Sequence, residues 1–258
     1  MAGREPVLKI AFLKAGEAKT AQTIVPKLQV YLLGATIAFG LSIVLGLTIP
    51  KLPSRQPVPY ARLLGSVFTS VARHPAALVT LLITGASFAV FSMFWTALTF
   101  LLSADPFHYT TSQIGLMGLA GLAGAIASRR AGIMHDKGWS VPATGAALGL
   151  LALSLIGAWF AQSSIIGLVV AVIVLDIAVM VNLILGQTRL VSLSDTERSR
   201  LNTAFVVFNF MGGALGSFLA GPLWSAGGWS GIMVGALVLT AAGLRIWAGS
   251  RARLVVKN

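Results

Sequence analysis

Seven apolar stretches of about 20 residues each limit the fold of this chain more than any other feature of its sequence. A helix of roughly 20 apolar residues is long enough to cross a lipid bilayer. The stretches are near-continuous, unlike the alternating ten-residue segments of a transmembrane β-barrel. Of all residues 56% are hydrophobic and only 10% are charged, whereas a soluble domain carries about 25% charge. We therefore predict an all-α, multi-pass membrane protein.

The predicted spans are Val30–Ile49, Ala76–Leu102, Ser112–Ala131, Pro142–Phe160, Ile165–Leu185, Asn202–Leu223 and Gly231–Ala248. These spans divide the chain into a first transmembrane helix at 29–50, a cytoplasmic linker at 51–75, a six-helix transmembrane bundle at 76–250 and a cytoplasmic tail at 251–258. Within the linker, 60–73 places apolar residues at helical spacing against two arginines, which predicts an amphipathic helix at the membrane surface.

Lysine and arginine occur in every second connection between the predicted spans, and this pattern predicts the topology. They occur at 51–75, 129–137, 189–200 and 245–257, and they are absent from 104–111, 161–164 and 221–230. Basic connections stay on the cytoplasmic side. The sequence therefore predicts seven spans in the cell membrane with a cytoplasmic C-terminus, and the net charge of +12 needs no nucleic-acid partner to explain it.

Residues 1–28 do not fit this topology, because seven spans place their five basic residues outside the cell. Either a basic segment is tolerated there, or 1–28 is not the native lead-in to the first span. We favour the second interpretation, which suits a chain that begins partway through a longer gene.

The composition gives little indication of an enzyme active site or a metal site. Cysteine is absent, and the three histidines lie far apart without a neighbour at ligand spacing, so no metal or other cofactor is predicted. The seven acidic residues do not cluster with histidines. The chain is therefore not expected to be an enzyme.

Asp176 is a single carboxylate near the middle of the Ile165–Leu185 span. A charged side chain at this depth costs on the order of 2.5–3.5 kcal/mol even on the lenient insertion scale. The functional interpretation makes Asp176 a proton-coupling or cation-binding group, and the structural alternative makes it a hydrogen-bonding partner of a neighbouring helix. We favour the functional interpretation.

Amide side chains also share helix faces in this region. Asp176 and Gln187 are eleven residues apart, and Asn202 and Asn209 are seven apart in the next span, so each pair returns to almost one face. These stripes suggest an interior surface shared by two helices. For the amides themselves we expect hydrogen bonds between helices.

The Ala76–Leu102 span combines hydroxyl and aromatic side chains. Ser92, Thr96 and Thr99 follow helical spacing, and Phe88, Phe91 and Trp95 form an adjacent aromatic stripe. Such a wall suits an amphipathic organic solute, while hydroxyl groups bonded back to their own helix are an equally good alternative.

Two glycine-rich segments predict close helix packing. Gly115, Gly118, Gly121 and Gly124 recur every three residues, and the sequence MGGALGS at 211–217 contains a small-xxx-small pattern. The loop that follows the first segment contains Gly132, Asp136, Lys137 and Gly138. On physical grounds this loop is a cytoplasmic turn in which a charged pair can brace two helix ends.

Four stretches, in this order, resemble the C-terminal half of a major facilitator superfamily transporter of the bacterial proton-coupled efflux type. They are FSMFWTALTFLL at 91–102, QIGLMGLAGLAGAIASRRAGIMHDKGW at 113–139, LDIAVMVNLILGQTRLVSLSDTERSRLN at 175–202 and FNFMGGALGSFLAGPLWSAGGW at 208–229. With the spans between them they cover roughly residues 30–250.

The resemblance implies a six-helix half of that fold plus one preceding transmembrane helix. Gly132, Asp136, Lys137 and Gly138 match the family's conformational-switch loop, although Trp139 stands where a basic residue is usual. The family uses two six-helix halves with the substrate site between them. A chain of this kind is expected to be a partial transporter that needs a complementary half or a second copy.

From these observations we predict proton-coupled efflux of a small organic solute across the lipid bilayer. Asp176 is the candidate for proton coupling, and Ser92, Trp95, Thr96, Thr99 and Asn209 are candidates for the wall of the substrate cavity. The alternative is a non-transporting scaffold or a decayed transporter half.

Overall fold

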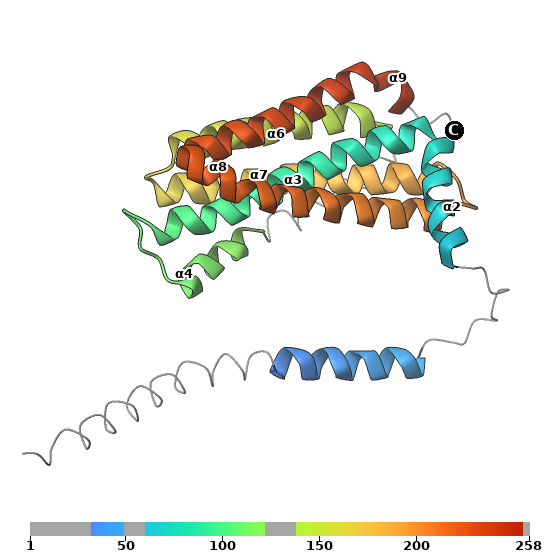
Figure 1. The fold of residues 1–258 in the computed structure, drawn as a ribbon, viewed down its shortest axis with the longest axis horizontal. Coiled ribbons are helices and arrows are strands. Elements are labelled where there is room, and N and C mark those ends of the chain that lie inside the picture. The colour runs from blue at the N-terminus through green and yellow to red at the C-terminus, as the bar shows by residue number, and fades with distance from the viewer. Residues whose placement is uncertain (1–31, 49–59, 122–137, 255–258) are drawn as a thin grey trace, which may run out of the picture. The chain divides into compact units, whose positions relative to one another are not determined.

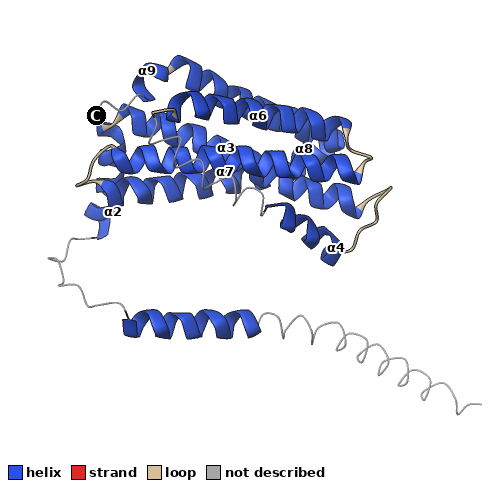
Figure 2. Cartoon of the chain, turned by 180° about the vertical axis from the view of Figure 1, so that it is seen from behind, coloured by secondary structure: helices blue, strands red, loops and turns tan. Residues whose placement is uncertain are grey.

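The structure is a computed structural model that describes residues 32–48, 60–121 and 138–254. Within these ranges every regular element is a helix (Figures 1 and 2). The chain divides into two units, Met1–Pro57 and Val58–Asn258. The first unit contains the apolar helix Leu32–Thr48, in which large side chains such as Phe39 and Leu47 are exposed.

In the described part of the second unit, four helices are long and apolar enough to cross a membrane. The elements of this unit are α2 (Tyr60–Arg73), α3 (Pro75–Ser103), α4 (Thr111–Leu116), the 3₁₀ helix η1 (Met117–Gly121), α6 (Ser140–Phe160), α7 (Ile165–Ser192), α8 (Arg198–Gly249) and α9 (Arg251–Leu254). The prediction of a helical protein with several long apolar spans is therefore confirmed for the described ranges.

Helix α8 contains both of the last two predicted spans. Each span forms one limb of α8, and the chain reverses direction between the two limbs. Gly227 and Gly228 have non-helical backbone angles, and Gly228 has a φ of 55°. Only glycine adopts such an angle without a steric cost from a Cβ atom. Beyond the reversal, a Cβ at Gly231 would lie 2.5 Å from the carbonyl oxygen of Leu223, so the second limb starts against the end of the first.

The predicted span Ser112–Ala131 differs from the structure in its first ten residues. The helix α4 ends at Leu116 and is followed by a 3₁₀ segment up to Gly121, and residues 122–131 lie outside the described ranges. Glycines at 115, 118 and 121 weaken the α-helix here, because each costs close to 1 kcal/mol relative to alanine.

The helices α3, α6, α7 and α8 lie side by side (Figures 1 and 2). The largest buried cluster joins all four, with Phe94 of α3, Leu151 of α6, Leu175 of α7 and Met233 of α8 among its members. A second cluster joins α2 to the bundle through Val71. The core is thus shared among helices, and no single helix could bury these side chains alone.

Basic residues gather at one end of this unit. Helix α2, the start of α3, the connection from α7 to α8, and the C-terminal helix α9 meet there. One buried cluster contains both Val71 and Leu201, and another contains both Val79 and Leu254. The connections at the opposite end, 104–110, 161–164 and 224–230, contain no lysine or arginine. For the described residues, the alternation of charge along the sequence therefore becomes a separation of charge in space.

Candidate functional site

Asp176 of α7 lies between α3 and the 3₁₀ helix η1. Its side chain is 4% exposed, and its Oδ1 accepts a hydrogen bond of 3.3 Å from the indole Nε1 of Trp95 on α3. On the other side, a Cβ added to Gly121 of η1 would lie 3.0 Å from Oδ2. The carboxylate therefore faces the interior of the bundle, which is the usual position for an intramembrane acid.

Helical spacing places Asp176 on the buried side of α7. Val172 and Val179 lie four residues before and three residues after it, and both are completely buried. Positions three and four residues apart share one helix face. The same pattern that buries the apolar side chains therefore carries the carboxylate into the core.

The aromatic side chains of α3 form a continuous row that ends at this carboxylate. Phe88 stacks on Phe91 with 5.5 Å between ring centroids, and Phe91 lies 6.2 Å from Trp95. Phe210 of α8 meets the edge of Phe88 at 6.3 Å. The sequence predicted the row and the carboxylate separately, and the structure brings them together through Trp95.

The hydroxyl groups of the predicted wall bond mainly to their own helix. Thr96 donates to the carbonyl oxygen of Ser92 at 2.7 Å, and Thr99 donates to that of Trp95 at 3.1 Å. Thr96 also lies 3.4 Å from the hydroxyl of Ser217 on α8. This geometry matches the packing alternative, and it leaves the hydroxyl oxygens of Thr96 and Thr99 at a partly open face.

The amide side chains of α7 and α8 form contacts between helices at two positions. Gln187 donates to Asn202 at 3.0 Å, and Asn182 donates to Ser87 of α3 at 3.4 Å. Asn209 differs from the expectation, because its amide nitrogen bonds to Phe205 of its own helix at 2.7 Å. The Asn209 Oδ1 atom is buried and has no hydrogen-bond partner among the described residues.

Only one residue of the predicted switch loop belongs to the described ranges. Gly138 has a φ of 74° and lies two residues before Ser140, the first residue of α6. Gly132, Asp136 and Lys137 lie outside the described residues.

Arg189 is a buried residue that sequence reasoning placed wrongly, among the basic residues of a loop. It lies inside α7, it is 1% exposed, and its guanidinium donates to Ser140 Oγ at 2.8 Å and to Thr144 Oγ1 at 2.9 Å. Its Nη1 atom also lies 3.4 Å from the hydroxyl of Thr80. The local sequence carries no signal for this, because the burial arises from α3 and α6 packing around the end of α7.

Glu197 is a second charged residue whose role the sequence did not reveal. It is 7% exposed, and it accepts hydrogen bonds from His74 at 2.9 Å, Arg73 at 3.0 Å and Ser70 at 3.2 Å. The bond from His74, together with Ser70 and the charge of Arg73, lowers the pKa of Glu197 despite its burial. Glu197 thereby holds α2 against the connection between α7 and α8.

The helices α3 and α8 approach closely at glycine residues. A Cβ on Gly212 would lie 2.2 Å from the carbonyl oxygen of Gly85, and one on Gly216 would lie 2.0 Å from that of Ala89. The predicted packing role of the 211–217 segment is confirmed. In the other glycine segment, Gly115 and Gly118 differ from the prediction, because nothing lies within 4 Å of an added Cβ, whereas Gly121 closely approaches Asp176. Gly124 lies outside the described residues.

Comparison with known proteins relates the chain to transporters. No family model matches it. It is 34% identical over 199 residues to the Uncharacterized transporter YgaY of Escherichia coli O157:H7, covering 77% of this chain and 50% of YgaY. It is 33% identical over 146 residues to the Probable transporter SCO4007 of Streptomyces coelicolor, covering 56% of this chain and 34% of that protein. The chain thus spans about half the length of YgaY, and it is homologous to part of a protein named as a transporter.

Proposed function

We propose that this chain forms a six-helix half of the major facilitator superfamily type, and that it takes part in proton-coupled export of a small organic solute. Three observations support the proposal: the ordered motifs of the sequence, the bundle of long apolar helices, and the similarity to part of two proteins named as transporters. A carboxylate buried among these helices supplies a group that can bind a proton.

The contact between Trp95 and Asp176 carries the proposal for the mechanism. Asp176 belongs to α7 and its hydrogen-bond donor belongs to α3, so movement of one helix against the other breaks the bond. A carboxylate that loses its donor in a medium without water favours proton uptake. In this way the position of the helices and the proton on Asp176 become coupled.

The other candidate residues take roles around this carboxylate. Ser92, Thr96, Thr99 and Asn209 line the substrate cavity together with Trp95, and the loop with Gly132, Asp136, Lys137 and Gly138 controls the conformational switch. The site is completed by a complementary transporter half or by a second copy. We also propose that the basic end of the bundle and the C-terminus face the cytoplasm of the cell.

Flux measurements test the role of Asp176. The protein, with any partner that co-purifies from native membranes, is reconstituted in liposomes that contain a pH-sensitive dye, and a panel of organic solutes is added. We expect one class of solute to change the internal pH, and the variant Asp176→Asn to abolish this change. The matched control is Asp105→Asn, whose carboxylate lies at the end of the bundle with a 91% exposed side chain. Solute-driven proton flux that survives in Asp176→Asn would remove this residue from the mechanism.

The need for a second half has its own test. Cross-linking in native membranes followed by mass analysis is expected to find the chain joined to a complementary half or to another copy. Proton-coupled flux by a single isolated copy in liposomes would contradict that part of the proposal and leave the role of Asp176 intact.

Labelling tests the orientation, and the absence of cysteine from the sequence makes it direct. Single cysteines are introduced by Ser163→Cys and Ala252→Cys, at exposed positions on opposite ends of the bundle. In intact cells, a membrane-impermeant maleimide should label position 163 and should reach position 252 only after permeabilisation. The reverse pattern would overturn the orientation.

A further inference from the structure

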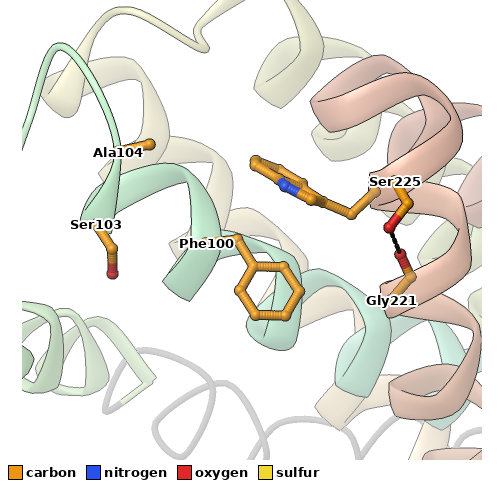
Figure 3. A pocket seen from close by; sticks show the side chains of 6 residues that line it. Phe100, Ser103, Ala104, Gly221 and Ser225 are labelled. Atoms are coloured by element: carbon orange, nitrogen blue, oxygen red, sulfur yellow. Dashed lines mark hydrogen bonds between the residues drawn. The ribbon is translucent and has the colours of Figure 1, made fainter.

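A cavity of about 390 Å³ opens between α3 and α8 at the end of the bundle that lacks basic residues (Figure 3). Its lining comes from the last turns of α3 and from α8 shortly before the Gly227–Gly228 reversal. The lining residues are Phe100, Ser103, Ala104, Gly221, Trp224 and Ser225. Cavities that hold small molecules begin at about 300 Å³, so this one has room for a ligand with a single ring.

Two aromatic side chains supply the apolar surface of the cavity. The rings of Phe100 and Trp224 meet edge to face with 5.5 Å between centroids. Phe100 is 38% exposed, so part of its ring remains available to another molecule. Aromatic rings favour such offset or edge contacts with further rings, and the cavity is therefore suited to a flat aromatic ligand.

The hydroxyl groups of the cavity are arranged to accept hydrogen bonds. Ser103 donates its proton to the carbonyl oxygen of Thr99 at 2.7 Å, and Ser225 donates to that of Gly221 at 3.1 Å, as Figure 3 shows for the second pair. A hydroxyl group that has used its proton keeps acceptor capacity on its oxygen. A ligand that meets both rings and hydroxyl oxygens should therefore carry an O–H or N–H donor.

The charge around the cavity disfavours an ionised ligand. The connections at this end contain no lysine or arginine, so a carboxylate or phosphate on the ligand would find no cation. The carboxylate of Asp105, next to the lining residue Ala104, is hydrogen-bonded to His108 and has a 91% exposed side chain, so solvent screens its charge and it attracts a cation only weakly.

We propose that this cavity binds an uncharged aromatic molecule with one hydrogen-bond donor, such as a phenol. The site is separate from the Asp176 region, and binding to it requires neither transport nor a proton gradient. The outcome of a binding test at this site is therefore independent of whether the proposed function is correct.

Fluorine NMR on the protein in lipid nanodiscs tests the binding directly, with empty nanodiscs as the reference for partition into lipid. The probes are 4-fluorophenol, 4-fluoroanisole, which lacks the donor, and 4-fluorobenzoate, which is an anion. We expect saturable binding of 4-fluorophenol, binding about fivefold weaker for 4-fluoroanisole, and no saturable binding of 4-fluorobenzoate. Equal signals with empty nanodiscs, or equal affinity for the benzoate, would overturn the proposal.

Variants locate the binding in the cavity. Trp224→Ala should weaken binding of 4-fluorophenol at least about tenfold, whereas Trp224→Phe keeps a ring and should retain most of it. Ser225→Ala should reduce the preference for 4-fluorophenol over 4-fluoroanisole without affecting the anisole. Phe160→Ala removes an 87% exposed aromatic side chain outside the cavity and should bind as the wild type does.

The variant Asp176→Asn separates this proposal from the proposed function, and it should bind 4-fluorophenol with unchanged affinity. Wild-type affinity in both Trp224→Ala and Ser225→Ala would place the probe elsewhere and refute the site.

Discussion

Trp95 and Asp176 lie 81 positions apart in the sequence and are joined by a hydrogen bond of 3.3 Å between the indole Nε1 and Oδ1. Each residue belongs to a different long helix, and the carboxylate is almost completely buried. The bond satisfies a polar group in a place where water is not available to do so, and an unsatisfied group there is costly. The pair is therefore both a structural contact and the most direct link between α3 and the acid of α7.

Replacement of Trp95 by phenylalanine tests the strength of this link. Trp95→Phe keeps an aromatic ring and removes the donor, so it should lower the free energy of unfolding by about 1–3 kcal/mol. Unfolding in mixed micelles, with an increasing fraction of a denaturing detergent, measures the change in the free energy of unfolding. The control is Trp159→Phe, which removes a bond of 3.0 Å to the neutral hydroxyl of Ser230 and should cost about 1 kcal/mol or less. Equal losses in both variants would argue against a special role for the buried carboxylate.

The sequence predicted the long helices well, and it predicted the contacts between them poorly. The span predicted at Ile165–Leu185 appears within α7, and the one predicted at Pro142–Phe160 appears as α6. The length and hydropathy of a segment are local properties of the sequence. A bilayer favours a helix wherever the sequence has a segment that is long and apolar enough.

The environment of a charged residue depends instead on which helices pack around it. Arg189 and Glu197 belong to the same predicted basic connection, yet the structure buries both. Arg189 is enclosed by α6 and α3, and Glu197 is enclosed by α2 and the start of α3. These partners lie between 45 and 127 positions away in the sequence. No pattern around either residue could have indicated them.

Close packing of α3 and α8 leads to a prediction at Gly216. A Cβ at this position would lie 2.0 Å from the carbonyl oxygen of Ala89, so Gly216→Ala must push the two backbones apart. Overpacking of this kind costs typically 1–3 kcal/mol in free energy of unfolding. The control is Gly149→Ala in α6, where nothing lies within 4 Å and alanine should stabilise the helix by up to about 1 kcal/mol. A neutral effect of Gly216→Ala would show that the helices can separate freely.

The guanidinium of Arg189 leads to a third stability prediction. One nitrogen donates to Ser140 and Thr144, and another lies 3.4 Å from Thr80. The compact ammonium of lysine cannot reach partners on both sides. Arg189→Lys should therefore lower the free energy of unfolding by about 1.5–3 kcal/mol.

The matched control for this variant is Arg198→Lys. Arg198 has a 56% exposed side chain and pairs with the exposed Asp195, so its replacement should change the free energy of unfolding by less than about 0.5 kcal/mol. An equally small loss of free energy of unfolding at Arg189 would mean that contacts from two nitrogens of the guanidinium do not stabilise the end of α7.

The lowered pKa of Glu197 leads to a prediction of how the attachment of α2 depends on pH. Its pKa is lowered from an ordinary value of 4.5, first by the hydrogen bond from His74. The stabilisation is therefore present above pH 4.5 and is lost as the pH falls through the lowered value. The thermal unfolding midpoint of the wild type should exceed that of Glu197→Gln near neutral pH, and the two should converge in acid.

Two further measurements make this prediction specific. Asp195→Asn changes a neighbouring carboxylate with a 90% exposed side chain, and its midpoint should stay close to that of the wild type over the same pH range. The attachment of α2 can be followed through hydrogen exchange at Val67 and Val71, which pack against the bundle. Exchange there at neutral pH should be faster in Glu197→Gln than in the wild type. If protection of α2 were equal in both proteins, the apolar contacts alone would hold this helix, and Glu197 would have no part in its attachment.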